Sequence, residues 1–110
     1  MTENASIAAA EPVILSKLVE YAPGSIVSRA LTQSKAGSLT LFAFEKGQGL
    51  SEHTAPYDAH VLIVEGEGLI TIGGKPVNAK PGEIVRMPAN ISHAVEAKER
   101  FKMLLVMVRG

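Results

Sequence analysis

The sequence contains no cysteine, which excludes disulfides, zinc–thiolate sites and cysteine nucleophiles and fits a reducing compartment. It also lacks an excess of charge of either sign, because 11 lysines and arginines balance 11 aspartates and glutamates. A chain without net charge has no basic surface for nucleic acid or for an anionic membrane. The same balance leaves little charge repulsion to oppose self-association. We therefore expect no nucleic-acid partner.

A signal peptide and a membrane span are missing too. The first ten residues carry Glu3 and neither lysine nor arginine, whereas a secretory signal begins with basic residues and continues into an apolar stretch. No apolar run is long enough to cross a bilayer. We therefore expect a cytoplasmic protein with no membrane partner.

Sustained helical periodicity is also absent, and short strands replace it from Val13 onward. Val61–Val64 is a continuous apolar run, as expected of a strand covered on both faces. Gly73-Gly74 predicts a type I′ hairpin, because both positions need a positive φ. Lys80-Pro81-Gly82 predicts a type II turn. About eight or nine strands with frequent turns indicate an all-β barrel or, as the alternative, a small β-sandwich without a pocket.

The chain divides into an arm and one domain. Residues 1–12 are small, polar and alanine-rich, while residues 13–110 carry the strand pattern. A length of 110 residues fits a single domain, and 46% hydrophobic residues argue for a folded core. A barrel of this size lacks the chain to cover both faces of every strand. We therefore expect a homodimer, in which the arm can dock on the neighbouring subunit.

Two separated segments carry glycine, proline and histidine at regular spacings. In the first, Gly47 precedes His53 by five intervening residues, and the segment closes on Gly66. In the second, a glycine, a proline, an asparagine and a histidine follow one another at fixed intervals, at Gly82, Pro88, Asn90 and His93. Both spacings resemble the paired signature motifs of the cupin family, with Asn90 in a glycine slot. Asparagine tolerates the left-handed conformation that such a slot requires.

The resemblance covers about Leu39 to Val108 and is closer still to a subgroup of very small microbial cupins. The shared phrases are Ser51–Pro56, Met87–Asn90 and Phe101–Leu105. It implies an all-β cupin fold, a double-stranded β-helix or jelly-roll-like antiparallel barrel. The subgroup has no agreed reaction, so the resemblance implies a fold and a pocket and names no substrate.

The resemblance also implies where a metal would bind. In metal-binding cupins the first motif supplies two histidines and a glutamate, and the second supplies the last histidine. The corresponding positions here are His53, Ala55, Ala59 and His93, so two of the four slots hold a methyl group. His53 and His93 are the candidate ligands for a weakly bound divalent ion such as Zn, Ni, Mn or Fe. His60 faces away on a regular strand and would become a ligand only if a bulge turned it inward.

Three functions stay open at this point. The first is a small-molecule-binding or sensing cupin, with an apolar pocket that the two alanines enlarge around the histidines. The second is a metal-dependent enzyme, such as a dioxygenase, isomerase or lyase acting on a small carbonyl compound. The third is a metal-free acid–base enzyme, which normally needs a carboxylate to orient the imidazole. Met87, Met103 and Met107 are predicted to fill the core rather than to bind a ligand, and Arg86 is predicted to face outward.

Overall fold

The structure is a computed structural model and describes residues 7–109. Within these residues the chain forms one short 3₁₀ helix, η1 (Leu15–Lys17), and nine strands. The first strands are β1 (Ile26–Ser34), β2 (Gly37–Phe44), β3 (Gly49–His53), β4 (Ala59–Glu65) and β5 (Gly68–Ile72). The remaining strands are β6 (Lys75–Ala79), β7 (Ile84–Met87), β8 (His93–Glu96) and β9 (Phe101–Val108). Half of the predicted arm, residues 1–6, lies outside the described residues.

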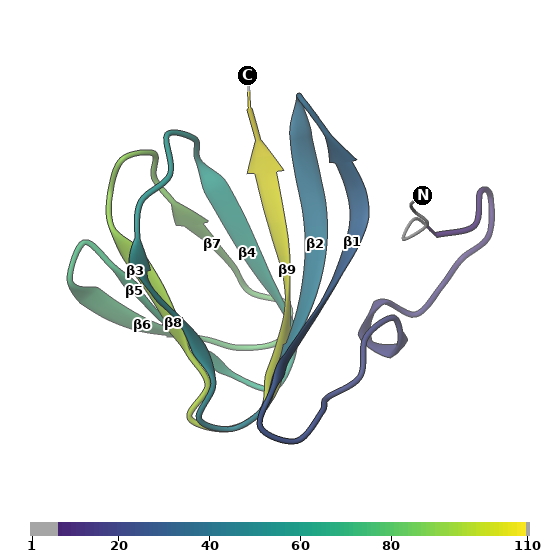
Figure 1. Ribbon diagram of the computed structural model, residues 1–110, viewed down its shortest axis with the longest axis horizontal. Helices are drawn as coiled ribbons and strands as arrows, with labels where there is room; N and C mark the ends of the chain where they lie inside the picture. Colours follow the sequence, from purple (N-terminus) through teal and green to yellow (C-terminus); the bar gives the residue numbers. More distant parts are fainter. Residues whose placement is uncertain (1–6, 110) are drawn as a thin grey trace.

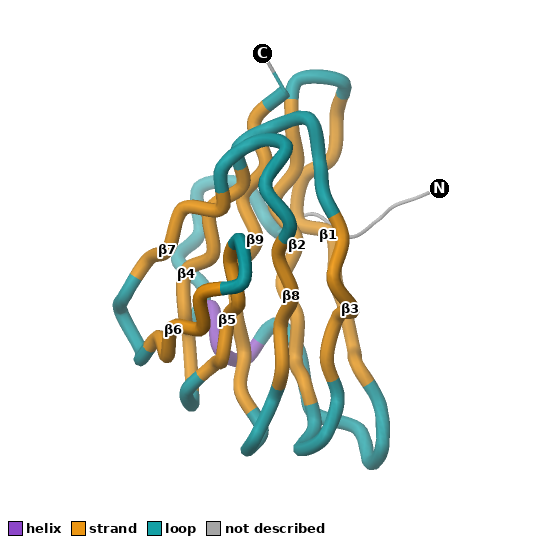
Figure 2. The backbone as a smooth tube through the Cα atoms, turned by 90° about the vertical axis from the view of Figure 1, so that its left-hand side faces the viewer, coloured by secondary structure: helices purple, strands orange, loops and turns teal. Residues whose placement is uncertain are grey.

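The strands form two antiparallel sheets that face each other (Figure 1). The five-stranded sheet has the order β1-β2-β9-β4-β7, and the four-stranded sheet has the order β3-β8-β5-β6. Figure 2 shows the four-stranded sheet from its outer side, with the chain crossing repeatedly between the two layers. The predicted all-β jelly-roll architecture is confirmed. Within the described residues, no helix has the length and hydropathy of a membrane span.

The predicted turns form as their residues require. Gly73 and Gly74 have φ values of 56° and 83° and connect the paired residues Ile72 and Lys75. At the next turn Gly82 has a φ of 87°, and the Glu83 N–H donates to the Lys80 carbonyl at 2.9 Å. The first turn therefore sets the register of β5 against β6, and the second carries the chain from β6 in one sheet to β7 in the other.

The core lies between the two sheets. The rings of Phe44 and Phe101 stack with centroids 4.9 Å apart, and both side chains are fully buried. The largest fully buried side chains also include Val61, Ile63, Ile70 and Met103. The two sheets lie close together at one end of the molecule and diverge toward the other (Figure 1).

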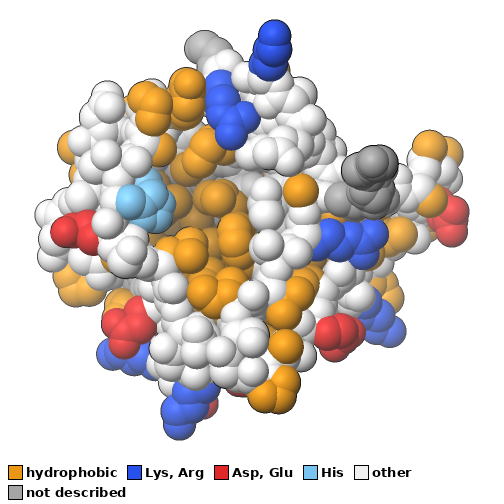
Figure 3. Space-filling model, viewed as in Figure 1, with side chains coloured by type: hydrophobic (Ala, Val, Ile, Leu, Met, Phe, Trp, Pro, Cys, Tyr) orange, Lys and Arg blue, Asp and Glu red, His pale blue; other side chains and the backbone are white. Residues whose placement is uncertain are grey.

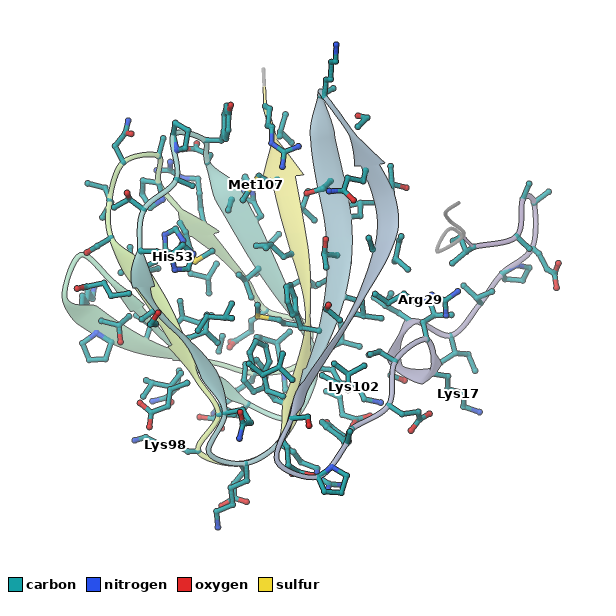
Figure 4. All side chains as sticks on the ribbon, in the orientation of Figure 1. Lys17, Arg29, His53, Lys98, Lys102 and Met107 are labelled. Atoms are coloured by element: carbon teal, nitrogen blue, oxygen red, sulfur yellow. The ribbon has the colours of Figure 1, made fainter. Side chains whose placement is uncertain are left out.

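The outer face of the five-stranded sheet is covered in part by the chain's own N-terminal segment. Four side chains between residues 15 and 21 pack on this face, namely Leu15, Leu18, Val19 and Tyr21. The buried Lys102 donates to the Ser16 carbonyl at 2.6 Å, and the Tyr21 hydroxyl donates to Glu65 at 2.7 Å. Figure 4 shows Lys102 beside this segment. The chain's own segment therefore covers this face under residues 15–21.

The rest of this outer face remains open. Ile84 and Val108 are both 61% exposed there, and Leu62 and Val106 are half-buried. Because alternate residues of these strands point into the core, all four side chains share the outward face. This open apolar face lies on the opposite side of the sheet from the barrel interior.

Candidate functional site

A β-bulge brings His53 into the barrel. Leu50 pairs with Val95 and packs against the core, and the next paired positions are His53 and His93. One more residue therefore lies on β3 than on β8 between these pairs, which is the signature of a bulge. Strict alternation from Leu50 would point Glu52 inward, whereas the bulge points His53 inward and leaves Glu52 exposed.

His53 and His93 meet at the open end of the barrel and form what we call the histidine pair. Their Nε2 atoms are 3.1 Å apart, and their rings meet edge to face at 75°. His93 is buried at 4% exposure, whereas His53 is exposed. Figure 4 shows the His53 side chain in the space between the sheets. The structure thus brings together the two histidines that the sequence predicted as neighbours.

A backbone carbonyl lies beside Nδ1 of each ring. His53 Nδ1 lies 2.7 Å from the Ser51 oxygen, and His93 Nδ1 lies 3.3 Å from the Ile91 oxygen. A carbonyl oxygen only accepts, so His53 Nδ1 carries the proton, and in the neutral ring Nε2 is a bare acceptor. With both rings neutral, the hydrogen bond network assigns His93 Nε2–H as the donor to His53 Nε2. His53 Nε2 is therefore the acceptor within the pair, whereas His93 can carry its proton on either ring nitrogen.

The pKa of His93 lies below its ordinary value. Burial is the main cause, and the charge of a protonated His53 adds to it, while the Ile91 carbonyl opposes the shift. A proton on His53 thus makes it harder to protonate His93 as well.

This pKa shift predicts a pH dependence of stability. The unfolded chain binds more protons than the folded chain once the pH falls below about 6.5, so the free energy of unfolding should decrease through that range. His93→Gln should flatten the decrease between pH 7.5 and 5.5, and the matched change His60→Gln should retain it. Urea unfolding across this range measures the difference, and parallel curves for the parent and His93→Gln would contradict the assignment.

The histidine pair lines a small apolar cavity. His53, His93, Leu50 and Val95 line it from the four-stranded sheet, and Met87, Met103, Leu105 and Met107 line it from the five-stranded sheet. The cavity has a volume of about 30 Å³. Figure 3 shows the hydrophobic hollow with a histidine at its edge. The pocket is therefore apolar, as predicted.

The cavity is smaller than the pocket expected from the two alanines, and the neighbouring methionines explain the difference. Ala59 is fully buried on β4, with Met87 paired to it on one side and Met107 on the other. Both methionines line the cavity. Their long side chains take up the room beside the alanine methyl group. The methionines thus fill the core as predicted, but they also form one wall of the pocket.

The donor set does not fit the three-histidine, one-glutamate metal site that the resemblance implies. Ala59 supplies only a methyl group to the interior, and Ala55 is engaged through its carbonyl, which accepts from the Asn90 N–H at 2.8 Å. Among residues 7–109, no three histidine, cysteine, aspartate or glutamate side chains lie close enough to hold a metal ion. The pair thus offers two imidazoles without a carboxylate.

His60 does not approach the histidine pair. The register of β4 is regular at this point, and His60 pairs with Arg86 and Val106 on the outward face. Arg86 also faces outward, as predicted, and forms an ion pair with Asp58 at 3.1 Å.

Asp58 has a positioning role that the sequence did not reveal. Its other carboxylate oxygen accepts from the Ala89 N–H at 2.8 Å, which is the main reason why the pKa of Asp58 is lowered. Asn90 follows in the left-handed conformation with a φ of 66°, as its glycine slot predicted. Asp58 thus ties β4 to the loop that leads into His93, a contact that no local sequence signal announces.

Comparisons with known proteins agree with this architecture. The cupin domain family matches residues 40–108. A conserved protein of unknown function from Streptococcus pyogenes is 35% identical, with 100% of this chain and 96% of that chain covered at a TM-score of 0.91. A cupin superfamily protein from Desulfitobacterium hafniense is 30% identical, with 99% and 100% covered at a TM-score of 0.90.

A third similar structure is longer than this chain. It is a cupin 2 conserved barrel domain protein from Leptotrichia buccalis, 45% identical, with 86% of this chain and 46% of that chain covered at a TM-score of 0.83. No curated protein matches the chain. The family match spans more than half of the sequence, and both the motifs and the jelly-roll fold agree with it. The chain therefore belongs to the cupin domain family.

Proposed function

We propose that this chain is a small-molecule-binding or sensing cupin whose ligand contacts the histidine pair. The observation that carries the proposal is the convergence of two imidazole Nε2 atoms, 3.1 Å apart, at the mouth of an otherwise apolar cavity. A few polar groups that converge in an apolar pocket are typical of ligand sites. The histidine pair fixes the polar end of the ligand, and the cavity takes its apolar part.

The lining residues define the chemical class of the ligand. None of the residues that line the cavity is aspartate, glutamate, lysine or arginine. When the His93 proton moves from Nε2 to Nδ1, beside the Ile91 carbonyl, His53 Nε2 can accept a hydrogen bond from a weak acid that keeps its O–H group at neutral pH. The cavity volume of about 30 Å³ lies far below that of a drug-sized site, so only a small group enters it. The ligand is thus a small phenol or enol with an apolar body.

The enzyme alternatives require groups that the site lacks. A metal-dependent enzyme of the usual family type needs the carboxylate that Ala59 replaces. An acid–base enzyme usually orients its imidazole with a carboxylate, whereas the Ser51 and Ile91 carbonyls do so here. A divalent ion on two imidazoles alone binds weakly. Binding without strong catalysis is the function that these residues support best.

The test of this proposal is an NMR titration with small acids that keep their O–H group at neutral pH, such as phenol. The ring signals of His53 and His93 should shift with added acid, while those of His60 provide the internal control. His53→Ala should weaken binding about tenfold, the upper end of the range for one neutral hydrogen bond. His60→Ala should leave the affinity unchanged. If none of these acids moves the signals of the histidine pair, the proposal is wrong.

We also propose that a second copy of this chain covers the open apolar face, so that the protein is a homodimer. The support is the exposure of Ile84 and Val108 beside the half-buried Val106 on one continuous sheet face. The formal net charge of zero adds little repulsion between copies. The interface would lie on the outward face, away from the histidine pair.

A further inference from the structure

We infer that the guanidinium of Arg109, at the mouth of the cavity, binds a carboxylate on the outer end of the ligand. The inference rests on the proposed function, because the histidine pair holds the O–H group at the inner end. A cavity of about 30 Å³ admits only a small group, so the rest of the ligand lies at its mouth. The ligand class narrows from phenols and enols in general to those that also carry a carboxylate.

The alternation of β9 puts Arg109 on the cavity side of the sheet. Every second residue near the end of this strand lines the cavity, namely Met103, Leu105 and Met107. Arg109 is the next position in the same series. Its N–H donates to the Ala36 carbonyl at 2.7 Å, so the pairing with the neighbouring chain continues one residue past the strand. Figure 1 shows β9 running toward the end where the two sheets diverge.

Three contacts hold the Arg109 side chain at this end of the barrel. Nη1 donates to the Ser34 carbonyl at 3.1 Å, and Nη2 lies 3.8 Å from the sulfur of Met107. The guanidinium carbon lies 5.8 Å from the centre of the Tyr57 ring, a distance typical of cation–π contacts. Tyr57 belongs to the connection between β4 and β3, which ends at His53. The guanidinium therefore lies between the β1–β2 turn and the β3–β4 connection, against a residue that lines the cavity.

The positive charge of Arg109 has no acidic partner. Among residues 7–109 no carboxylate forms an ion pair with its guanidinium, whereas Arg86 and Arg100 each have a carboxylate partner. A guanidinium has five N–H donors, and the thioether beside Nη2 is only a weak acceptor. A carboxylate that takes the place of the thioether makes charge-assisted hydrogen bonds, and the planar fork suits two of them at once. Figure 3 shows a basic side chain at the edge of the hydrophobic hollow.

The experiment compares ligands that differ at one end only. The full chain is titrated at neutral pH with 3- and 4-hydroxybenzoate, with their methyl esters and with benzoate, by calorimetry and by NMR of the histidine rings. The tighter-binding hydroxybenzoate should bind about tenfold more tightly than its methyl ester, the gain expected from a hydrogen bond to a charged group. Arg109→Gln should remove this gain and leave the affinity for the ester unchanged. Lys35→Gln is the matched control, because it removes an exposed positive charge from the β1–β2 turn and should retain the gain.

Thermal melts confirm that each variant folds, and the comparison of acid with ester on the parent does not depend on any variant. Hydroxybenzoates that bind the parent no more tightly than their esters overturn the inference. An equal gain in Arg109→Gln, or its loss in Lys35→Gln, overturns it as well. The proposed function stands in each of these cases if the esters shift the signals of the histidine pair. If the esters leave those signals unchanged and benzoate binding still depends on Arg109, the proposed function fails and the carboxylate site stands.

Discussion

Ala55→His combined with Ala59→Glu is expected to raise the affinity for Mn²⁺ or Ni²⁺ by orders of magnitude. The double change restores the two ligands that the cupin motif places beside His53 and His93, and a site with three imidazoles and one carboxylate suits these ions. Residue 59 is buried between Met87 and Met107, both of which line the cavity. The expectation therefore tests the assignment of the two alanines to ligand slots.

Without metal the same variant should be less stable than the parent by about 1–3 kcal/mol, the usual range for overpacking a core. Ala59 is fully buried between Met87 and Met107, and a glutamate there is crowded and desolvated. Metal that binds only the folded state should reverse the loss, by about 2.7 kcal/mol at a hundred times Kd.

Thermal melts with and without Mn²⁺ or Ni²⁺ measure both effects. Ala55→Gln with Ala59→Gln is the control, since it adds similar bulk without the charged ligand. If the histidine and glutamate variant shows no more metal-dependent stabilisation than this control, Ala55 and Ala59 are not the ligand slots. His60 would then be the first residue to reconsider, although it now faces outward.

Val106→Glu is expected to convert the proposed homodimer into a monomer. Val106 lies on the outward face of β9, paired with Leu39 and His60 near the middle of the sheet. A glutamate at this position would bring a charged carboxylate into the interface and cost its desolvation, even beside His60. Light scattering should give about twice 11.6 kDa for the parent and 11.6 kDa for the variant.

Thr71→Glu is the matched control for this prediction. Thr71 faces outward on β5, because its neighbour Ile70 is fully buried. The same substitution on the outer face of the other sheet should leave the mass of the dimer unchanged. A parent that returns 11.6 kDa at micromolar concentration would contradict the proposed interface.

The sequence predicts strands and turns well wherever the type of a single residue determines the backbone conformation. Gly73-Gly74 adopts positive φ values that other residues avoid, and in Lys80-Pro81-Gly82 the proline ring fixes one φ while Gly82 takes a positive one. The bulge in β3 is different, because neither Ser51 nor Glu52 signals it. Alternation alone would place Glu52 in the pocket, and only the family motif identified His53 as the inward residue.

The pocket shows why a site is harder to predict than its fold. The alanines suggested an enlarged cavity, but its size depends on which strands flank β4. Met87 and Met107 are far apart in the sequence and become neighbours of Ala59 only through the strand order β9-β4-β7. Cross-strand pairing of this kind is not encoded in any local pattern, and neither is the contact of Asp58 with Ala89.

The most direct test of the account is a long-range ¹H–¹⁵N NMR spectrum of the three histidines at pH 8. The account predicts that His53 carries its proton on Nδ1, next to the Ser51 carbonyl, and that its Nε2 is the acceptor in the histidine pair at the cavity. His53→Ala identifies its signals. A His53 ring that carries its proton on Nε2 would contradict the account, because His53 would then offer no acceptor to a small acid.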